Sequence, residues 1–223
     1  MLQEERLNTE TPGDDKPAVS VTPMPLDVIR SDQAIPTRWK NNLGESRLIL
    51  RSPPDGEPGD FDWQVGTATM SGTLPFSDYP GIDRSLCVIG GQGLRIRSQL
   101  RDLVLTKESA PFHFQGEEKI VGTTLGQDVM QDFNILSRRD GFTHQTRRVS
   151  VPPEGVAHPV GDISIIYVQT GRATVTLGSQ SVEMDTGDTA IARDSNLGHC
   201  QIASQQDSVC IIGDITYSAG TRR

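Results

Sequence analysis

Residues 61–97 place the strongest constraint on how this chain folds. Residues 61–65 alternate apolar and polar side chains, which is the period of a β-strand with one buried face. Residues 85–89 form a short apolar run, and residues 94–97 alternate again after the glycine-rich turn at 90–93. We therefore predict that this turn closes a β-hairpin of the kind found in a small antiparallel barrel.

The rest of the chain continues this pattern of short strands and turns. Further apolar or alternating runs occur at 23–29, 45–51, 103–106, 112–114, 128–139, 147–151, 164–168, 173–177, 180–184, 188–192 and 209–213. No segment has a convincing amphipathic helical period, so the pattern predicts an all-β fold. The second half also repeats the first in outline, because residues 165–175 and 86–96 each read as strand, glycine turn and strand.

The composition argues against several classes of protein. The 223 residues include 21 basic and 29 acidic ones, and the net charge of −8 argues against a nucleic-acid-binding protein. No run approaches the roughly 18 apolar residues of a membrane span, and the acidic, polar start does not resemble a secretory signal. Cys87, Cys200 and Cys210 lack paired or metal-type spacing, which suggests buried free thiols. We expect a soluble, cytoplasmic protein with neither a nucleic-acid nor a membrane partner.

Several motifs, in chain order, resemble those of one known family. The sequence FDWQV at 61–65, followed by PFSDYPGIDRSLCVIGGQGLRI at 75–96, carries the main match. Three further segments resemble family patterns. RWKN at 38–41 resembles W-(K/R)-N-G-G-G, PFHFQG at 111–116 resembles P-F-x-F-x-G, and DFNILSRR at 132–139 resembles V-R-D-(F/L)-N-V-M-T-R-R. The chain therefore resembles the HutD/Ves family.

This resemblance implies a bicupin, which is two cupin-like antiparallel β-barrels in one chain. We place the parts of the chain as a flexible N-terminal arm at 1–24, a first barrel at 25–140, a second barrel at 141–217 and a tail at 218–223. The function that the resemblance implies is narrow, because one branch of the family is linked to histidine utilisation through proposed binding of small formylated acids. The family's glycine run is replaced here by Asn41-Asn42-Leu43-Gly44. If the glycines let the backbone approach a ligand closely, these side chains would fill that space, so the identity of the ligand stays open.

Metal-dependent cupins need two His, a carboxylate and a third His to converge from neighbouring strands. In the first half, the motif aligned on its final glycine places Arg84 at the carboxylate position and Ser77 and Tyr79 at His positions. A cation at that position would repel a metal ion. In the second half, His158 and His199 fall at two of the four ligand positions. These two are either remnants of a metal site or a loop residue and a turn residue.

Arg84 is the strongest single candidate for a binding residue. Its position in a cupin faces the barrel interior, where a buried guanidinium needs either a protein carboxylate or an anionic ligand as partner. Asp132 is the candidate protein partner, and Asn134 lies two residues further along, so both face one side of their strand. A structural ion pair and a pocket for a small carboxylic acid both stay open. The full set of candidate ligand-binding residues is Lys40, Asn41, Arg47, Trp63, Phe76, Ser77, Tyr79, Arg84, Phe112, Asp132 and Asn134.

Three functions are compatible with these residues. The leading one is metal-independent, cofactor-free binding of a small polar or anionic metabolite, such as a formylated amino acid, in a regulatory or accessory role. The second is a cofactor-independent acid–base enzyme (an isomerase, cyclase or lyase) in which Lys40, Tyr79, Asp132 or a histidine moves a proton. The third is a metal-dependent enzyme that uses His158 and His199. No stretch fixes the oligomeric state, and a homodimer formed by strand pairing is left open.

Overall fold

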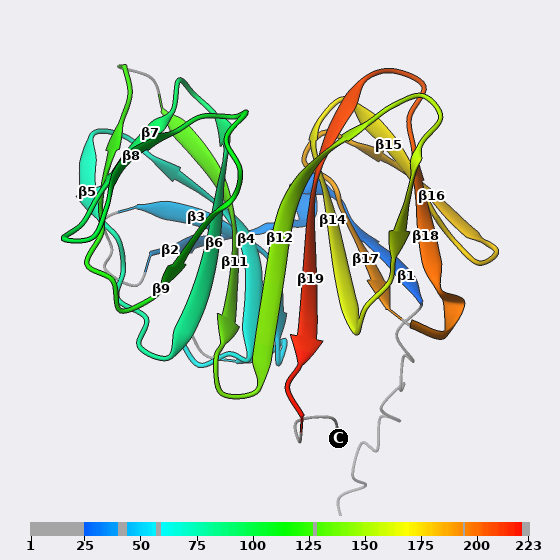
Figure 1. The fold of residues 1–223 in the computed structure, drawn as a ribbon, viewed down its shortest axis with the longest axis horizontal. Coiled ribbons are helices and arrows are strands. Elements are labelled where there is room, and N and C mark those ends of the chain that lie inside the picture. The colour runs from blue at the N-terminus through cyan, green and yellow to red at the C-terminus, as the bar shows by residue number, and fades with distance from the viewer. Residues whose placement is uncertain (1–24, 40–43, 57–58, 127–128, 194, 220–223) are drawn as a thin grey trace, which may run out of the picture.

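The strands of this protein are arranged in four antiparallel sheets (Figure 1). The computed structural model describes residues 25–39, 44–56, 59–126, 129–193 and 195–219. Within these ranges the only helices are two short 3-10 turns, η1 (Ser31–Gln33) and η2 (Ser195–Leu197). None of the described residues form a helix long and apolar enough to cross a membrane.

Two of the sheets are built from the first half of the chain. The six-stranded sheet has, in spatial order, β2 (Ile35–Arg38), β3 (Glu45–Ser52), β4 (Trp63–Met70), β11 (Met130–Arg138), β6 (Ile82–Gly90) and β9 (Phe112–Gln115). The four-stranded sheet has β5 (Thr73–Pro75), β10 (Val121–Thr124), β7 (Leu94–Arg97) and β8 (Asp102–Leu105).

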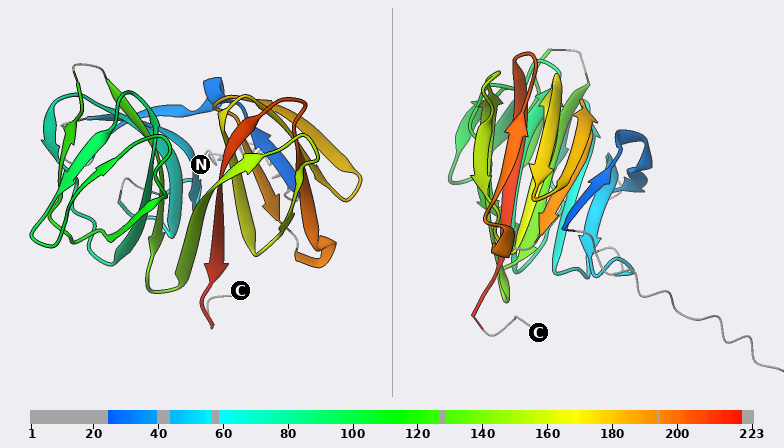
Figure 2. Two further views of the ribbon diagram at one scale, coloured as in Figure 1. Left: turned by 45° about the horizontal axis from the view of Figure 1, so that its top comes forward. Right: turned by 90° about the vertical axis from the view of Figure 1, so that its right-hand side faces the viewer.

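The other two sheets come mainly from the second half. The five-stranded sheet has β1 (Leu26–Ile29), β17 (Thr189–Arg193), β14 (Ile163–Thr170), β19 (Ser208–Tyr217) and β12 (Phe142–Val151). The last sheet has β13 (Val156–Pro159), β18 (His199–Ala203), β15 (Arg172–Leu177) and β16 (Gln180–Asp185). Although β1 precedes every strand of the first half, it pairs with β17 through Leu26 opposite Ala192. From β1 onward, the described chain therefore runs from the second half to the first at η1, as Figures 1 and 2 show.

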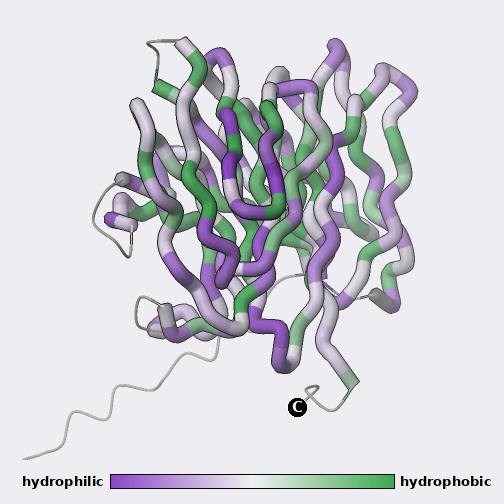
Figure 3. The backbone as a smooth tube through the Cα atoms, turned by 60° about the vertical axis from the view of Figure 1, so that its left-hand side comes forward, coloured by the Kyte–Doolittle hydropathy of each residue, from purple (hydrophilic) through white to green (hydrophobic). Residues whose placement is uncertain are grey.

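The predicted all-β class is confirmed, but the described strands do not close into barrels. Each of the four sheets ends in two edge strands, so within the described ranges no sheet is a continuous ring of hydrogen bonds. Apolar and polar residues interchange along the strands (Figure 3), which gives each sheet one or two buried faces. The fold is therefore held together by packing between sheets.

Three of the four apolar clusters among the described residues fill the spaces between the sheets. The central core joins the two halves, because the six-stranded and five-stranded sheets pack against each other there. In it the ring of Phe133 on β11 lies 4.7 Å, between centroids, from that of Tyr167 on β14. A second core lies between the two sheets of the first half and includes Leu86, Ile96 and Met130. A third lies between the two sheets of the second half. Central strands are thus buried on both faces.

The predicted hairpin around residues 90–93 is wrong. β6 and β7 lie in different sheets, and the turn between them carries the chain from one sheet to the other. Gly91 makes this possible with a φ of 79°, a conformation that glycine adopts without strain. The predicted repeat is nevertheless seen, because β14 and β15 make the same change of sheet around Gly171, with a φ of 83°.

Candidate functional site

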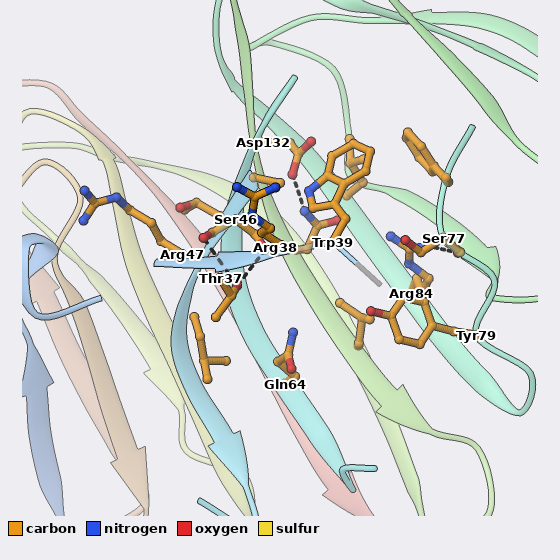
Figure 4. A pocket seen from close by; sticks show the side chains of 18 of the residues that line it. Thr37, Arg38, Trp39, Ser46, Arg47, Gln64, Ser77, Tyr79, Arg84 and Asp132 are labelled. Carbon is orange, nitrogen blue, oxygen red and sulfur yellow. Dashed lines mark hydrogen bonds between the residues drawn. The ribbon is translucent and has the colours of Figure 1, made fainter. Parts of the chain in front are cut away.

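A cavity of about 520 Å³ opens on the inner face of the six-stranded sheet (Figure 4). Strand alternation and register decide which side chains form its floor. On β11, Asp132 lies between Ala68 of β4 and Val88 of β6, and Asn134 lies between Gly66 and Leu86. One step further, Leu136 lies beside Arg84. Because these positions are two residues apart on β11, they share one face of the sheet.

Arg84 is held at one end of the cavity by aromatic rings. Its guanidinium carbon lies 4.7 Å from the ring centroid of Phe114, 5.4 Å from that of Tyr79 and 5.6 Å from that of Phe76. Its Nη1 donates a hydrogen bond of 3.1 Å to the carbonyl of Ser77, while its Nε is buried without a partner in the described structure. Burial lowers the pKa of Arg84 to about 10, so the guanidinium is still charged at neutral pH. This end of the cavity therefore presents a desolvated cation with a free donor.

Asp132 and Asn134 form a buried polar pair on the floor. Only 2% of Asp132 and 9% of Asn134 is exposed, and the side-chain amide of Asn134 donates to Oδ1 of Asp132. The Asn134 Oδ1 atom is buried and has no hydrogen-bond partner among the described residues. Burial raises the pKa of Asp132 to about 7, against the opposing effects of the Asn134 hydrogen bond and the Arg84 charge. The carboxyl group is thus partly protonated near neutral pH.

The structural ion pair between Arg84 and Asp132 is not formed. No N–O contact within 4.0 Å joins these two residues in the described structure, although the charge of each stabilises the charged form of the other. Arg84 instead uses the Ser77 carbonyl, and Asp132 uses Asn134. Of the two alternatives that the sequence left open, the Asp132 ion pair is therefore not formed, and no carboxylate among the described residues pairs with Arg84.

The sequence reasoning missed a second buried guanidinium in this cavity. Arg51 donates to the Gly56 carbonyl, and its Nε is buried without a partner in the described structure. Leu48 faces the cavity, and Arg51 lies three residues further along β3. In a regular strand, residues an odd number apart face opposite sides, so Arg51 would point away from the cavity. A register shift between Leu48 and Leu50 reverses that order and sets Arg51 opposite Gln64. No signal in the sequence marks this bulge.

The structure gathers most of the other predicted site residues around the cavity. Those that line it are Arg47, Phe76, Ser77, Tyr79, Arg84, Asp132 and Asn134. Arg47 stands at the edge, where Nη1 lies 3.4 Å from the Ala34 carbonyl, and Figure 4 shows its side chain directed away from Arg84. The edge near β2 and β3 also has Thr37, Arg38, Trp39, Ser46 and Gln64, which the sequence reasoning did not select.

Four predicted residues fall elsewhere. Trp63 is buried in the central core, because the odd-numbered residues of β4 face the second half. Phe112 is buried between the two sheets of the first half and does not line the cavity. Lys40 and Asn41 lie outside the described residues. Trp39 and Leu48 are among the apolar residues that line the cavity instead.

His158 and His199 do not converge. His158 lies in β13 rather than in a loop, and its Nε2 is 2.9 Å from Asp214 Oδ1 and 3.3 Å from Ser164 Oγ, while Nδ1 contacts Arg147. His199 is exposed on β18. Its neighbour Cys200 is the residue paired with His158, so Cys200 shares the face of His158 and His199 lies on the opposite face of the sheet. No group of three or more His, Cys, Asp or Glu side chains is placed to hold a metal ion in the described ranges. These residues do not fit the cupin metal-ligand set.

Known proteins resemble this chain in sequence and in fold. The sequence model of the HutD family matches residues 31–211. Protein Ves of Citrobacter koseri is 30% identical over 102 residues, which are 46% of this chain and 52% of Ves, so the chain spans about half the length of this curated relative.

Among solved structures, HutD from Pseudomonas fluorescens SBW25 has a TM-score of 0.71 and 19% identity, covering 87% of this chain and all of that one. A cupin 2 conserved barrel domain protein from Leptotrichia buccalis has a TM-score of 0.54 and 11% identity, covering 86% and 96%. At these identities the structural likeness shows the fold alone, which is an all-β fold with cupin-like neighbours. The family match extends over most of the chain, including every described residue of the cavity. This chain belongs to the HutD/Ves family.

Proposed function

We propose that this protein binds a small organic acid in the cavity beneath Arg84, without a metal ion. The observation that carries the proposal is the buried Nε of Arg84, which has no hydrogen-bond partner among the described residues, while Phe76, Tyr79 and Phe114 hold the guanidinium in place. A buried donor that makes no hydrogen bond lowers stability, and a charge-assisted hydrogen bond to a ligand carboxylate removes that penalty. The aromatic rings orient the guanidinium and exclude water around it.

The floor of the cavity indicates what the rest of the ligand contains. Asn134 offers an unpaired carbonyl oxygen, and Asp132 offers a carboxyl group that is partly protonated near pH 7. Both groups suit a neutral polar group such as an amide better than an ammonium, which would also meet repulsion from Arg51 and Arg84. An N-acylated amino acid, for instance a formylated one, carries a carboxylate and an amide within a few bonds. The related HutD structure is described in a formate condition.

The binding test uses thermal unfolding and calorimetric titration with N-formylglutamate, formate and free glutamate. A ligand at ten times its Kd stabilises the folded state by about 1.4 kcal/mol, which raises Tm by about 3–6 °C for a chain of this size. Arg84→Gln removes the charged fork and should abolish the shift. Arg97→Gln is the matched control, because Arg97 is an exposed arginine on β7, away from the cavity. Unchanged binding by Arg84→Gln, or no shift with any acid, would refute the proposal.

A second function deserves a test because of one observation, the pKa of about 7 at Asp132. A buried carboxyl group that titrates near neutral pH can accept or donate a proton at a bound acid. An acid–base enzyme would exchange a carbon-bound hydrogen of its substrate for solvent deuterium, which NMR detects. Asp132→Asn should stop the exchange, and exchange at the same rate in both proteins would exclude Asp132 as the base.

We further propose that each half corresponds to one cupin-like unit, with the boundary near residue 140. The repeated change of sheet at Gly91 and Gly171 and the cupin-like structural neighbour support this division. The pairing of β1 with β17 then means that the second unit takes one strand from the N-terminal side of the first.

A further inference from the structure

A second polar cluster lies on the opposite face of β6 from Arg84, at the junction of the two halves. Ser85 is 1% exposed and sits between two imidazoles, His113 from β9 in the first half and His144 from β12 in the second. Ser137 of β11, which is fully buried, closes the other side of the His144 ring. Neither the cavity under Arg84 nor the proposed binding function uses this cluster.

The two imidazoles face one common point. His144 Nε2 lies 2.7 Å from Ser85 Oγ, His113 Nδ1 lies 2.9 Å from the same atom, and the ring centroids are 6.4 Å apart. The second nitrogen of His144, Nδ1, is 2.6 Å from Ser137 Oγ, which fixes the orientation of the ring. Thr146 Oγ1 also donates to Ser85 Oγ at 3.0 Å. Two ring nitrogens and a hydroxyl oxygen therefore converge from three strands.

We propose that His113 and His144, with Ser85 as a third donor, bind a divalent transition-metal ion such as Zn²⁺ or Ni²⁺. Metal–nitrogen bonds of about 2.0–2.1 Å place neighbouring donor atoms about 2.9 Å apart in an octahedral complex and about 3.4 Å apart in a tetrahedral one. The observed separations of 2.7 and 2.9 Å are already close to these values. Small side-chain shifts bring all three donors to bonding distance, and water fills the remaining positions. Ser137 then acts as the outer partner that holds the His144 ring.

The surroundings favour metal binding over protonation. Burial lowers the pKa of His144 to about 4 and lowers that of His113, so both rings are neutral at physiological pH and have a lone pair to share. A surface hollow of about 900 Å³ reaches both rings and gives an ion access from solvent. Its carboxylates are already paired, Asp83 and Glu117 with Arg139 and Glu118 with Arg101, so the imidazoles carry the affinity.

The other soft donors of the chain are poorly placed to compete. Burial raises the pKa of each thiol, Cys87, Cys200 and Cys210, so these sulfurs stay protonated. His158 is fully engaged with Arg147, Ser164 and Asp214, and this leaves His199 as a lone exposed imidazole.

The test is calorimetric titration of the untagged, full-length protein with Zn²⁺ and with Ni²⁺ in a buffer that does not coordinate metals. We expect one ion per chain, with affinity reduced at least about tenfold in His113→Ala and in His144→Ala because each loses one of two imidazole ligands. His199→Ala removes an exposed imidazole elsewhere and should bind as the wild type does. His113 is exposed, so His113→Ala decides the question even where His144→Ala does not fold.

Three results would overturn the proposal: no binding by the wild type up to about 0.2 mM metal, equal affinity in the wild type and His113→Ala, or loss of binding in His199→Ala alone. An NMR titration separates the remaining cases, since a specific site broadens or shifts the ring signals of His113 and His144 before those of His199. Uniform effects on all four histidines would mean only weak surface association.

Discussion

Single residues on the cavity floor are arranged for binding at the expense of stability. Asp132 is the clearest case, because its burial opposes ionisation more strongly than hydrogen bonds from the Asn134 side chain and the Ala68 backbone favour it. Arg51 and Arg84 each keep a buried nitrogen without a partner in the described structure, and such donors lower stability unless a ligand meets them. The residues whose replacement would most increase stability are thus the ones that the proposed ligand binding requires.

Asp132→Asn should stabilise the protein at alkaline pH. The folded-state pKa of about 7 lies above the unfolded value of 3.8, so the folded state binds more protons between these values and loses stability as pH rises toward and through 7. Asparagine has no such penalty. We expect the difference in unfolding free energy between Asp132→Asn and the wild type to grow by about 2–3 kcal/mol between pH 5 and pH 8, measured by urea denaturation. A parallel pH dependence in both proteins would show that Asp132 ionises normally.

At the scale of elements, strand alternation explains how much of the site the sequence predicted. The two-residue spacing of Asp132 and Asn134 predicted their shared face, and the cupin motif placed Arg84; all three line the cavity. The same rule failed for Arg51, because the bulge in β3 changes which residues face inward without a sequence signal. The prediction that β6 pairs with β7 in a hairpin was also wrong, because local patterns do not show whether a glycine turn closes a hairpin or carries the chain to another sheet. Long-range pairings such as β1 with β17 are set only by the complete fold.

The change of sheet at Gly91 can be tested against a glycine of similar conformation. A Cβ added at Gly91 would lie 2.8 Å from the Val129 carbonyl oxygen and 3.0 Å from Met130 Cα, whereas one added at Gly72 meets nothing within 4 Å. Both glycines have positive φ, 79° and 75°, so alanine incurs similar backbone strain at each, about 1 kcal/mol. Gly91→Ala should therefore lower the unfolding free energy by about 1–2 kcal/mol more than Gly72→Ala. Equal losses in chemical denaturation would mean that β11 yields easily at this turn.

At the scale of the whole molecule, the central core makes one folding unit of the two halves. β11 and β4 from the first half and β14 and β19 from the second contribute side chains to the same apolar cluster. Figure 1 shows β12 and β19 at this junction, and β1 pairs with β17 at the opposite edge of the five-stranded sheet. The cavity and the histidine cluster lie on opposite faces of β6, so the rigidity of this junction positions both. A molecule built this way should unfold in one cooperative transition.

Gly213 tests this coupling directly, because it lets β19 approach β11 across the central core. A Cβ at Gly213 would overlap the Cδ1 atom of Ile135 in the opposite half, at 2.0 Å. Gly213→Ala should destabilise the protein by about 1–2 kcal/mol, and Ile135→Val by about 0.5–1.5 kcal/mol through the lost methyl group. The double variant should be more stable than the sum of these losses predicts, because the shorter side chain makes room for the new methyl. Fluorescence and circular dichroism should follow the same transition in every variant. Strictly additive losses, or two separate transitions, would show that the halves fold independently and that the junction is only a contact between them.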